Sequence, residues 1–435
     1  MNYLFNIPLS MHIGKPSSPT VKEGDLVERG QCVAEPDGLG ARIHSSVSGV
    51  VKEISEGFIV IEASENQSRD YVKVKKGKDM VETVFNAGVV GAGGAGFPTH
   101  VKLKTDLNGG HIVANAAECE PALHHNIKGI EKDAGLFIRG IRHAMRMTGA
   151  GDAVIGIKGK NENAVAALRK ELGSDDSIKI HLLADMYPMG EERALIHDIF
   201  GTWLEPTQLP SDAGCVVLNV ETLKNIAMAI DEFKPVIDKD FTIIGKIGRP
   251  DGVRIFSDVP VGTSVKKLIE DVGGIDGDFG ELIIGGPYTG KAAGIDDSVV
   301  TKISGGAIVT IPFPQFRGKL GLLVCACGAD EARLRDIARK MGSEVVSVAE
   351  CKNVVKIKGA NKCMTPGDCP GQAQAVLKLK REGAERLLIS NCSDCSNTVM
   401  CSAPNLGLPV YHHTDHVMRT IGHDLTRRLP FSGDE

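Results

Sequence analysis

The stretch Gly88-Val-Val-Gly-Ala-Gly-Gly-Ala-Gly-Phe-Pro-Thr-His-Val-Lys-Leu103 decides how the centre of this chain is interpreted. Gly91, Gly93 and Gly96 satisfy the pattern G-x-G-x-x-G, which alone is a weak signal for a dinucleotide site. A Rossmann loop would open a long helix, whereas Pro98 disfavours helical backbone at the residue before it. The bare backbone N–H groups of clustered glycines suit a phosphate or a flat ring pressed against the chain. A tightly packed structural turn is the alternative.

Around this loop, strand-like and helical segments alternate from residue 80 to residue 232. Apolar runs such as 111–115 and 153–157 are typical of buried strands, and 162–172 is typical of a helix. Strands that alternate with helices indicate an α/β arrangement with a largely parallel sheet. A similar pattern restarts at residue 320.

The N-terminal region consists of short strand-like segments and turns. Residues 21–34 and 41–54 each alternate apolar and polar positions around glycines, and the two halves resemble the barrel-sandwich hybrid of lipoyl and biotinyl domains. The lysine that would carry a prosthetic group is missing, because Ile43-His44-Ser45 stands at the expected turn. We therefore expect a structural role for this region.

Composition narrows the classes of function. The net charge of −5, with no basic stripe interleaved with aromatic residues, argues against nucleic-acid binding. No window approaches 18 uninterrupted apolar residues, and residues 1–10 lack the features of a signal peptide, so we expect a cytoplasmic protein without direct membrane insertion.

The cysteines are concentrated towards the C-terminus. The chain has 11, and eight of them lie beyond residue 320: Cys325, Cys327, Cys351, Cys363, Cys369, Cys392, Cys395 and Cys401. Structural disulfides are rare in the cytoplasm, where thiols are kept reduced. Such a density indicates a metal cluster or thiol redox chemistry.

Five segments, in order along the chain, carry a family resemblance. Gly91–Leu103 resembles the flavin loop of the NADH-oxidising subunit of complex I and, more closely, that of the C subunit of the Rnf ferredoxin:NAD oxidoreductase. The other four are Asn115–Pro121, Tyr187–Ile196, Leu218–Thr222 and Gly285–Gly290. Ordered motifs are far more specific than the glycine loop alone.

The resemblance implies FMN and NADH as cofactors. Lys102 would neutralise the FMN phosphate or a charge at N1, and Glu191 and Glu192 would face the ribose hydroxyls of the nicotinamide nucleotide. Both glutamates are also explained as first-turn residues of a helix. The expected cofactor-binding residues are Gly91, Gly93, Gly94, Gly96, Lys102, Asn115, Glu118, Gly190, Glu191, Glu192 and Asn219.

The cysteine-rich region departs from the Rnf pattern, because it lacks the two C-x-x-C-x-x-C runs of the Rnf C subunits. Cys325 and Cys327 follow one predicted strand, and Cys392 and Cys395 follow another. Since ligands bind at the carboxyl edge of a parallel sheet, these four thiols should converge as catalytic groups. Three chemistries fit: a [4Fe-4S] cluster held by a subset of the eight cysteines, a Cys392/Cys395 dithiol–disulfide pair, or a zinc site.

The flavin loop joined to this cysteine tail resembles one family along essentially the whole chain, the PrdC electron-transfer proteins associated with D-proline reductase in amino-acid-fermenting clostridia. This implies electron transfer from NADH to the proline reductase subunits, which cleave D-proline to 5-aminovalerate. The alternatives are a C subunit of a membrane Rnf complex, and a zinc-bound docking subunit without flavin.

The expected fold class is α/β multidomain. Residues 1–75 would form a barrel-sandwich hybrid, and 80–232 an FMN- and NADH-binding α/β domain. Residues 240–312 would form a β-grasp-like unit of the soluble-ligand-binding type, containing a ubiquitin-like ββα element at 241–275 and returning to the flavin domain. Residues 320–435 would form a cysteine-rich α/β redox domain.

Overall fold

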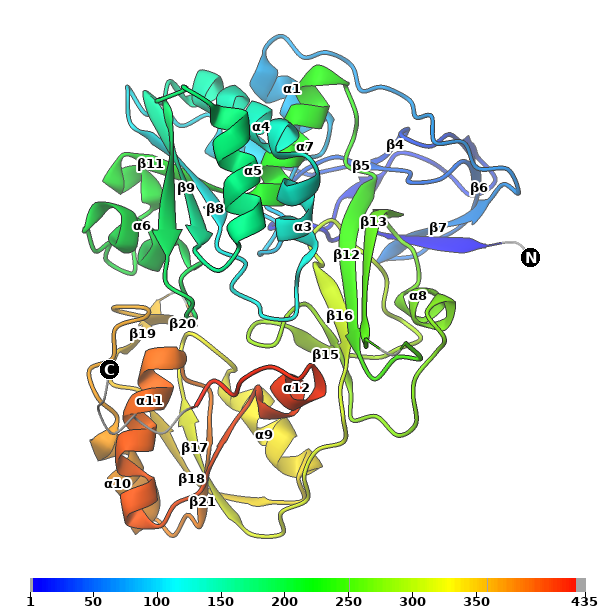
Figure 1. The fold of residues 1–435 in the computed structure, drawn as a ribbon. Coiled ribbons are helices and arrows are strands. Elements are labelled where there is room, and N and C mark those ends of the chain that lie inside the picture. Colours follow the sequence, from blue (N-terminus) through cyan, green and yellow to red (C-terminus); the bar gives the residue numbers. More distant parts are fainter. Residues whose placement is uncertain (1–2, 250, 358, 428–435) are drawn as a thin grey trace.

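The chain is a mixed α/β protein built from several sheets, as its sequence predicts (Figure 1). The structure is a computed structural model that describes residues 3–249, 251–357 and 359–427. In Figure 1 the central sheet lies at the upper left, the N-terminal strands at the right, and the cysteine-rich region below.

Two small antiparallel sheets form the N-terminal region, and they enclose one core that includes Ile7, Ile43, Ile59 and Ile61. His44, which stands where a prosthetic lysine would be, is buried with 2% of its surface exposed. The first sheet contains β1 (Leu4–Pro8), β7 (Phe58–Ala63), β6 (Gly49–Ile54) and β3 (Leu26–Val27), and the second contains β2 (Ser18–Pro19), β4 (Cys32–Glu35) and β5 (Ile43–His44).

The central sheet has four parallel strands in the order β10-β9-β8-β11, which are Ile178–Leu183, Asp152–Lys158, His111–Ala116 and Cys215–Asn219. Strands β9, β8 and β11 are apolar and largely buried, because helices cover both faces of the sheet, whereas the edge strand β10 is only partly buried. One face packs against α1 (Met80–Asn86), α3 (His125–Lys132), α4 (Ala134–Thr148), α5 (Glu162–Leu172) and α7 (Val220–Asp231). The other packs against α6 (Glu192–Phe200). The short helices α2 (Thr99–Lys102) and η1 (Pro210–Ala213) lie in the connections.

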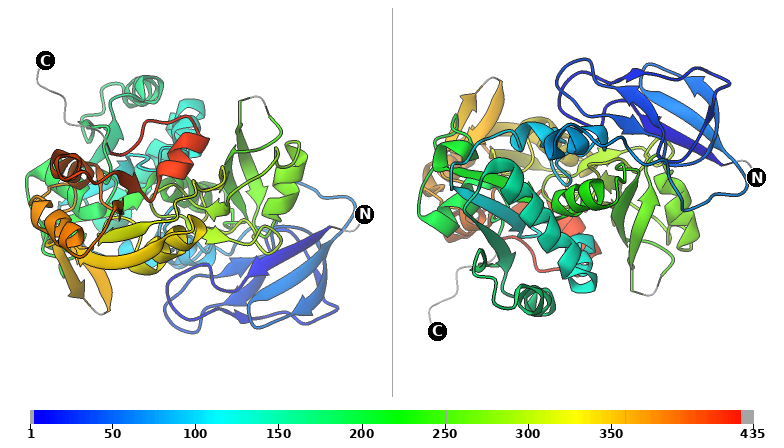
Figure 2. Two further views of the ribbon diagram at one scale, coloured as in Figure 1. Left: turned by 90° about the horizontal axis from the view of Figure 1, so that it is seen from below. Right: turned by 90° about the horizontal axis from the view of Figure 1, so that it is seen from above.

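A mixed sheet follows, with strand order β13-β12-β16-β14-β15 and helix α8 (Val265–Asp271). Its strands are β12 (Asp238–Gly245), β13 (Val253–Pro260), β14 (Leu282–Ile284), β15 (Lys291–Ala293) and β16 (Gly306–Val309). Both views in Figure 2 show this sheet beside the N-terminal strands. Val261 packs into the N-terminal core, and the buried Lys302 donates to the carbonyl oxygens of Arg42 and Gly88 at 2.7 and 2.8 Å. The flavin-type loop is therefore fixed to both regions.

The C-terminal region has its own parallel sheet, ordered β18-β17-β21-β22 (Glu344–Glu350, Lys319–Val324, Arg386–Ile389 and Val410–His412). Its helices are α9 (Glu331–Lys340), α10 (Ala373–Arg381), α11 (Ser393–Ser402), η2 (Pro404–Leu406) and α12 (Asp415–Thr420), and β19 (Val354–Ile357) and β20 (Ala360–Cys363) form a hairpin. Glu281 joins this region to the preceding sheet, because its carboxylate accepts from His416, Arg333 and Lys340.

Candidate functional site

A cavity of about 600 Å³ lies where the glycine loop meets the carboxyl ends of β8 and β11. The two strands bring Asn115 and Asn219 into register opposite each other, as expected for ligand-binding residues at the edge of a parallel sheet. The lining includes every predicted cofactor-binding residue except Glu118: Gly91, Gly93, Gly94, Gly96, Lys102, Asn115, Gly190, Glu191, Glu192 and Asn219.

The glycine loop is a turn held by backbone hydrogen bonds, and its glycines leave bare backbone along part of the cavity wall. The Gly91 N–H donates to Phe97 O at 2.9 Å, and the Ala92 N–H donates to Thr222 Oγ1 at 2.9 Å. Gly93 and Gly96 have φ values of 72° and 73°, a region that residues with a Cβ rarely adopt. A Cβ on Gly94 would meet no atom within 4 Å, and one on Gly93 would meet only Asn219 Nδ2, at 3.6 Å. This open cradle of backbone fits a flat ring and a phosphate, which are the parts of FMN.

The polar side chains of the cavity hold its backbone in place. Asn115 Nδ2 donates to Gly190 O at 2.8 Å, and Asn219 Oδ1 caps α7 by accepting from the Glu221 N–H at 2.8 Å. Lys102 Nζ lies 2.6 Å from Glu192 Oε1, so two residues predicted to contact different ligands are paired with each other.

Glu191 has the structural role that its sequence position offered as an alternative. It is the N-cap of α6 and accepts from the Arg193 and Ala194 N–H groups at 2.9 and 3.0 Å. The residue also lines the cavity, so capping leaves its predicted contact with a nucleotide open.

Glu118 lies outside the cavity lining, which differs from its expected place in the flavin site. Its backbone has a φ of 39°, and its Oε2 atom is buried without a hydrogen-bond partner. Burial raises the pKa of Glu118 to about 8, against a hydrogen bond with Asn126 that lowers it. The neighbouring Cys119 is closer to the cavity, because its Sγ accepts from the Gly190 N–H at 2.6 Å.

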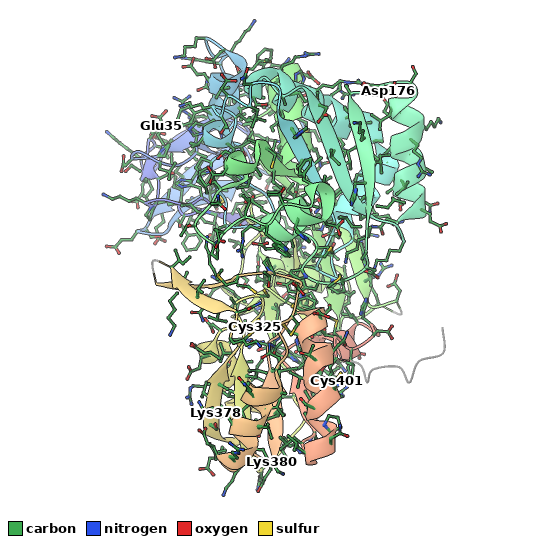
Figure 3. The ribbon with its side chains drawn as sticks, turned by 90° about the vertical axis from the view of Figure 1, so that its left-hand side faces the viewer. Glu35, Asp176, Cys325, Lys378, Lys380 and Cys401 are labelled. Atoms are coloured by element: carbon green, nitrogen blue, oxygen red, sulfur yellow. The ribbon has the colours of Figure 1, made fainter. Side chains whose placement is uncertain are left out.

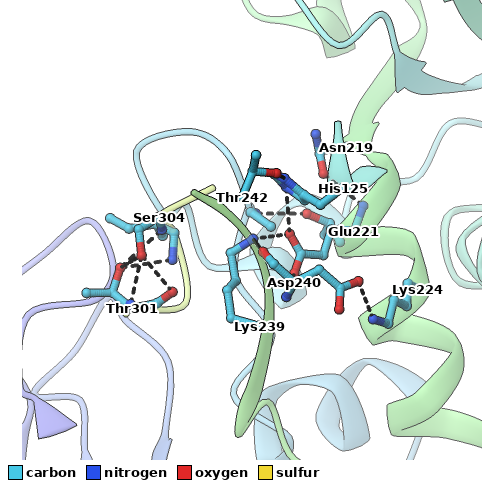
Figure 4. Close-up of polar contacts among 12 residues, drawn as sticks. His125, Asn219, Glu221, Lys224, Lys239, Asp240, Thr242, Thr301 and Ser304 are labelled. Carbon is cyan, nitrogen blue, oxygen red and sulfur yellow. Dashed lines mark hydrogen bonds and ion pairs between the residues drawn. The ribbon is translucent and has the colours of Figure 1, made fainter. Parts of the chain in front are cut away.

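A buried polar network behind the cavity fixes the start of α7 (Figure 4). Lys239 Nζ donates to the Glu221 carboxylate, and both side chains are at most 3% exposed. His125 Nε2 lies 3.9 Å from the same carboxylate, and Lys224 pairs with Asp240 at 2.6 Å. Since α7 carries Asn219 and Thr222 at the cavity, this network positions them. It joins residues from three elements, so no local sequence motif marks it.

Seven of the eight C-terminal cysteines converge at the carboxyl edge of the second parallel sheet. The thiols contact one another by hydrogen bonds: Cys327 with Cys325, Cys363 and Cys392, Cys395 with Cys351, Cys369 and Cys392, and Cys325 with Cys351. We call these seven the thiol cluster. Figure 3 shows Cys325 inside the C-terminal region and Cys401 on helix α11, where Cys401 is exposed.

The contacts within the thiol cluster separate the acidities of its members. Hydrogen bonds from Cys325 and Cys327 lower the pKa of Cys351 to about 2 and that of Cys392 to about 3. The pKa values of Cys327 and Cys395 are raised, because the thiol of each lies within hydrogen-bond distance of several neighbouring sulfurs, which favour its protonated form. The contacts therefore favour the thiolate at Cys351 and Cys392 over the thiolate at Cys327 and Cys395. Within the described ranges, no three His, Cys, Asp or Glu side chains are already arranged to hold a metal ion.

The segment Tyr187–Gly190 connects the cavity with the thiol cluster. Gly190 lines the cavity, and at the other end Tyr187 Oη donates to the carbonyl oxygen of Cys327 at 2.5 Å. The Tyr187 backbone also exchanges hydrogen bonds with Ser393, at 3.1 and 3.2 Å. Tyr187 stacks on Tyr288 with ring centroids 3.7 Å apart. The two candidate sites are therefore adjacent.

Comparisons with known proteins identify the N-terminal region and the region around the cavity as two known domains. Residues 2–74 match the "RnfC Barrel sandwich hybrid domain", and residues 84–228 match the "Nuo51 FMN-binding domain". The C subunit of the Na(+)-translocating ferredoxin:NAD(+) oxidoreductase complex of Acetobacterium woodii is 34% identical over 330 residues, which are 69% of this chain and 72% of that relative. The chain belongs to the RnfC family. It therefore has an FMN-binding domain and is a member of a family of flavin oxidoreductases.

Two further relatives are similar to different shares of the chain. The C subunit of the proton-translocating ferredoxin:NAD(+) oxidoreductase complex of Clostridium ljungdahlii is 32% identical over 69% of both chains. The cobalamin reductase PduS of Salmonella typhimurium is 40% identical over 228 residues, which are 52% of this chain and 49% of that protein. Among the residues described here, no helix has the length and apolar character needed to cross a membrane.

Sequence reasoning missed several residues of this RnfC-type site. Thr222 and Tyr187 lie inside motifs that carry the family resemblance, but their roles, accepting from the glycine loop and reaching Cys327, depend on contacts across the fold. Cys119 was likewise not predicted, although it stands in the motif Asn115–Pro121.

Proposed function

We propose that this RnfC-type protein takes electrons from NADH at an FMN held in the 600 Å³ cavity and passes them through the thiol cluster to D-proline reductase. The observation that carries the proposal is that one short segment, Tyr187–Gly190, lines the cavity at one end and binds the thiol-cluster backbone at the other. Bound FMN would supply the capacity to accept a hydride and to release electrons.

The residues that would hold FMN are those of the open glycine cradle. Gly93 and Gly94 would let the ring approach the backbone, and Asn115 and Asn219 would bound the cavity from the strand ends. Lys102 and Glu192 form a partly exposed ion pair, and bound ligands would separate it. The FMN phosphate would bind the Lys102 ammonium, and the ribose hydroxyls of the nicotinamide nucleotide would donate to the Glu192 carboxylate.

The cysteine pattern of the C-terminal region is the basis for proposing D-proline reductase as the electron acceptor. The chain lacks the ferredoxin-type cysteine runs of the Rnf C subunits, so electrons leave by a different set of sulfurs. A partner whose own reaction is a two-electron reductive cleavage suits a carrier with many redox-active thiols.

Protein purified without oxygen tests the first half of the proposal. We expect one FMN per chain, with a visible flavin absorption that bleaches when NADH is added. A colourless protein that contains only zinc would instead identify a docking subunit without flavin.

The acceptor is tested by reconstitution. NADH, D-proline and D-proline reductase should yield 5-aminovalerate only when this chain is added. A chain variant carrying Gly94→Ala is the matched control, because it alters the flavin cradle and leaves the thiol cluster unchanged. Formation of 5-aminovalerate at the same rate without the chain would refute the assignment of the partner.

A further inference from the structure

Within the thiol cluster, Cys369 and Cys395 form a contacting pair at its edge. Cys369 is half-buried, whereas Cys395 is 3% exposed and lies behind it. The other half-buried member, Cys327, lies on the side that faces the flavin cavity, because Tyr187 binds its carbonyl oxygen. Electrons that enter near Cys327 therefore have an outlet at Cys369.

One thiol of the pair lies in the loop before a helix, and the other lies in the first turn of the next helix along the chain. Cys369 lies four residues before Ala373, the first residue of α10, and Cys395 lies in the first turn of α11. The Cys369 N–H donates to Asp394 Oδ2, at 2.8 Å, so the loop that precedes α10 is held against α11.

A buried amide group is aimed at this pair. Gln372 is 2% exposed, and its Nε2 lies 3.6 Å from Cys369 Sγ, 3.8 Å from Cys395 Sγ and 3.0 Å from Cys351 Sγ. The Gly371 N–H also donates to Cys369 Sγ, at 3.3 Å. Two independent N–H donors therefore meet at one accessible sulfur. Such donors stabilise the sulfur as an anion, which is the form that attacks a disulfide.

We propose that Cys369 and Cys395 are the exit dithiol, which reduces a disulfide of the acceptor. The Cys369 thiolate attacks one sulfur of that disulfide, so a mixed disulfide forms and the acceptor's other sulfur leaves as a thiolate, which takes up a proton. Cys395 then loses its proton and attacks Cys369 Sγ, which forms the Cys369–Cys395 disulfide and releases the second acceptor thiol. Two electrons pass to the acceptor, and its two thiols take up two protons, one released by Cys395 and one from solvent.

The assignment of roles follows from exposure. Cys369 is the member that an external disulfide reaches, and the buried Cys395 meets only Cys369 and its other cluster neighbours. The Cys369–Cys395 disulfide must then be reduced again by two electrons and two protons. This re-reduction rests on the proposed function, whereas the exchange step itself does not.

Trapping with oxidised glutathione tests the exchange step. The protein is reduced with dithiothreitol under anaerobic conditions, desalted, exposed to oxidised glutathione and mapped by mass spectrometry. We expect a Cys369–Cys395 cross-link in the native chain and a stable glutathione adduct on Cys369 in Cys395→Ser. Cys401→Ser is the matched control, since Cys401 is an exposed cysteine of the same helix, and it should give the native cross-link. An adduct of Cys395→Ser on any other cluster cysteine, or none, would overturn the proposal.

Three further measurements distinguish failure of the exchange step from misfolding and from failure of the proposed function. Gln372→Leu, which keeps both thiols, should slow adduct formation on Cys369 about tenfold through loss of a hydrogen bond to a charged sulfur, and an unchanged rate would contradict the role of the amide. Iron content should be the same in the native chain and in Cys369→Ser, and loss of iron would make Cys369 a ligand instead. NADH bleaching of the flavin is followed in each variant. Its absence in the native chain, with the cross-link still formed, would refute the proposed function alone.

Discussion

Replacing Gly94 with alanine should weaken FMN binding and leave the unliganded fold intact. Gly94 lines the cavity, its φ lies outside the left-handed region, and a Cβ there would meet no protein atom within 4 Å. The methyl group therefore costs the unliganded protein nothing in packing or backbone strain. It occupies space beside the backbone that the flavin is expected to use.

The magnitude follows from the cost of overpacking. An extra methyl group in a close-packed contact costs about 1–3 kcal/mol, which corresponds to a roughly 5- to 150-fold increase in the Kd of FMN. Gly93→Ala should also destabilise the unliganded fold, because a φ of 72° at an alanine adds backbone strain of about 1–2 kcal/mol. Gly93→Ala should therefore lower the melting temperature of the unliganded protein as well.

The assay is titration of flavin-free protein with FMN, followed by quenching of flavin fluorescence. Gly57→Ala is the matched control, since a Cβ at Gly57 also meets nothing within 4 Å and the residue lies in the N-terminal region, outside the cavity. An equal Kd of FMN in Gly94→Ala and Gly57→Ala would refute this reasoning, whether or not both variants bind more weakly than the native chain.

Three other changes test the site and the joints between regions. Lys102→Ala should reduce FMN retained after gel filtration about tenfold or more, since it removes a charged partner for an anion, and the exposed Lys104→Ala should retain it fully. Glu281→Gln should destabilise the protein by about 3–5 kcal/mol in thermal unfolding, because Glu281 is buried and binds His416, Arg333 and Lys340. Burial raises the pKa of Glu281, but the hydrogen bonds from those three side chains outweigh it and hold the pKa well below its ordinary value of 4.5. The ionised Glu281 therefore stabilises the folded protein above pH 4.5, and this stabilisation is lost as the pH falls. Burial lowers the pKa of Lys302 from 10.5 to about 7, so stability should rise with pH between these values, and Lys302→Met should flatten that slope.

The fold was largely predictable because strand and helix periodicities dominate this sequence. The parallel order of the central sheet follows from alternating strands and helices, and the cavity lies at the carboxyl edge where such folds bind ligands. Convergence of the thiols was predictable for the same reason, since Cys325 and Cys392 follow parallel strands that lie side by side.

The remaining features depend on contacts that no local pattern encodes. Glu118 follows Ala117 inside a family motif, yet a left-handed backbone at Glu118 places it outside the cavity. The inclusion of Cys351, Cys363 and Cys369 in the thiol cluster depends on how the hairpin and the loop before α10 fold back over the sheet edge. Such packing is decided by tertiary contacts, which outweigh local sequence preference.

The short connection between the two sites has a consequence for how they respond to ligands. Tyr187–Gly190 is four residues long, so it spans at most about 14 Å, and each end is fixed, Gly190 by Asn115 and Cys119 and Tyr187 by Cys327 and Ser393. We expect a ligand that displaces Gly190 in the cavity to displace Tyr187 as well, and with it the backbone that carries Cys327. Binding free energies are reciprocal between coupled sites. Oxidation of the thiol cluster that shifts Cys327 should therefore change the affinity of the cavity for FMN, and FMN should change the ease of that oxidation by the same factor.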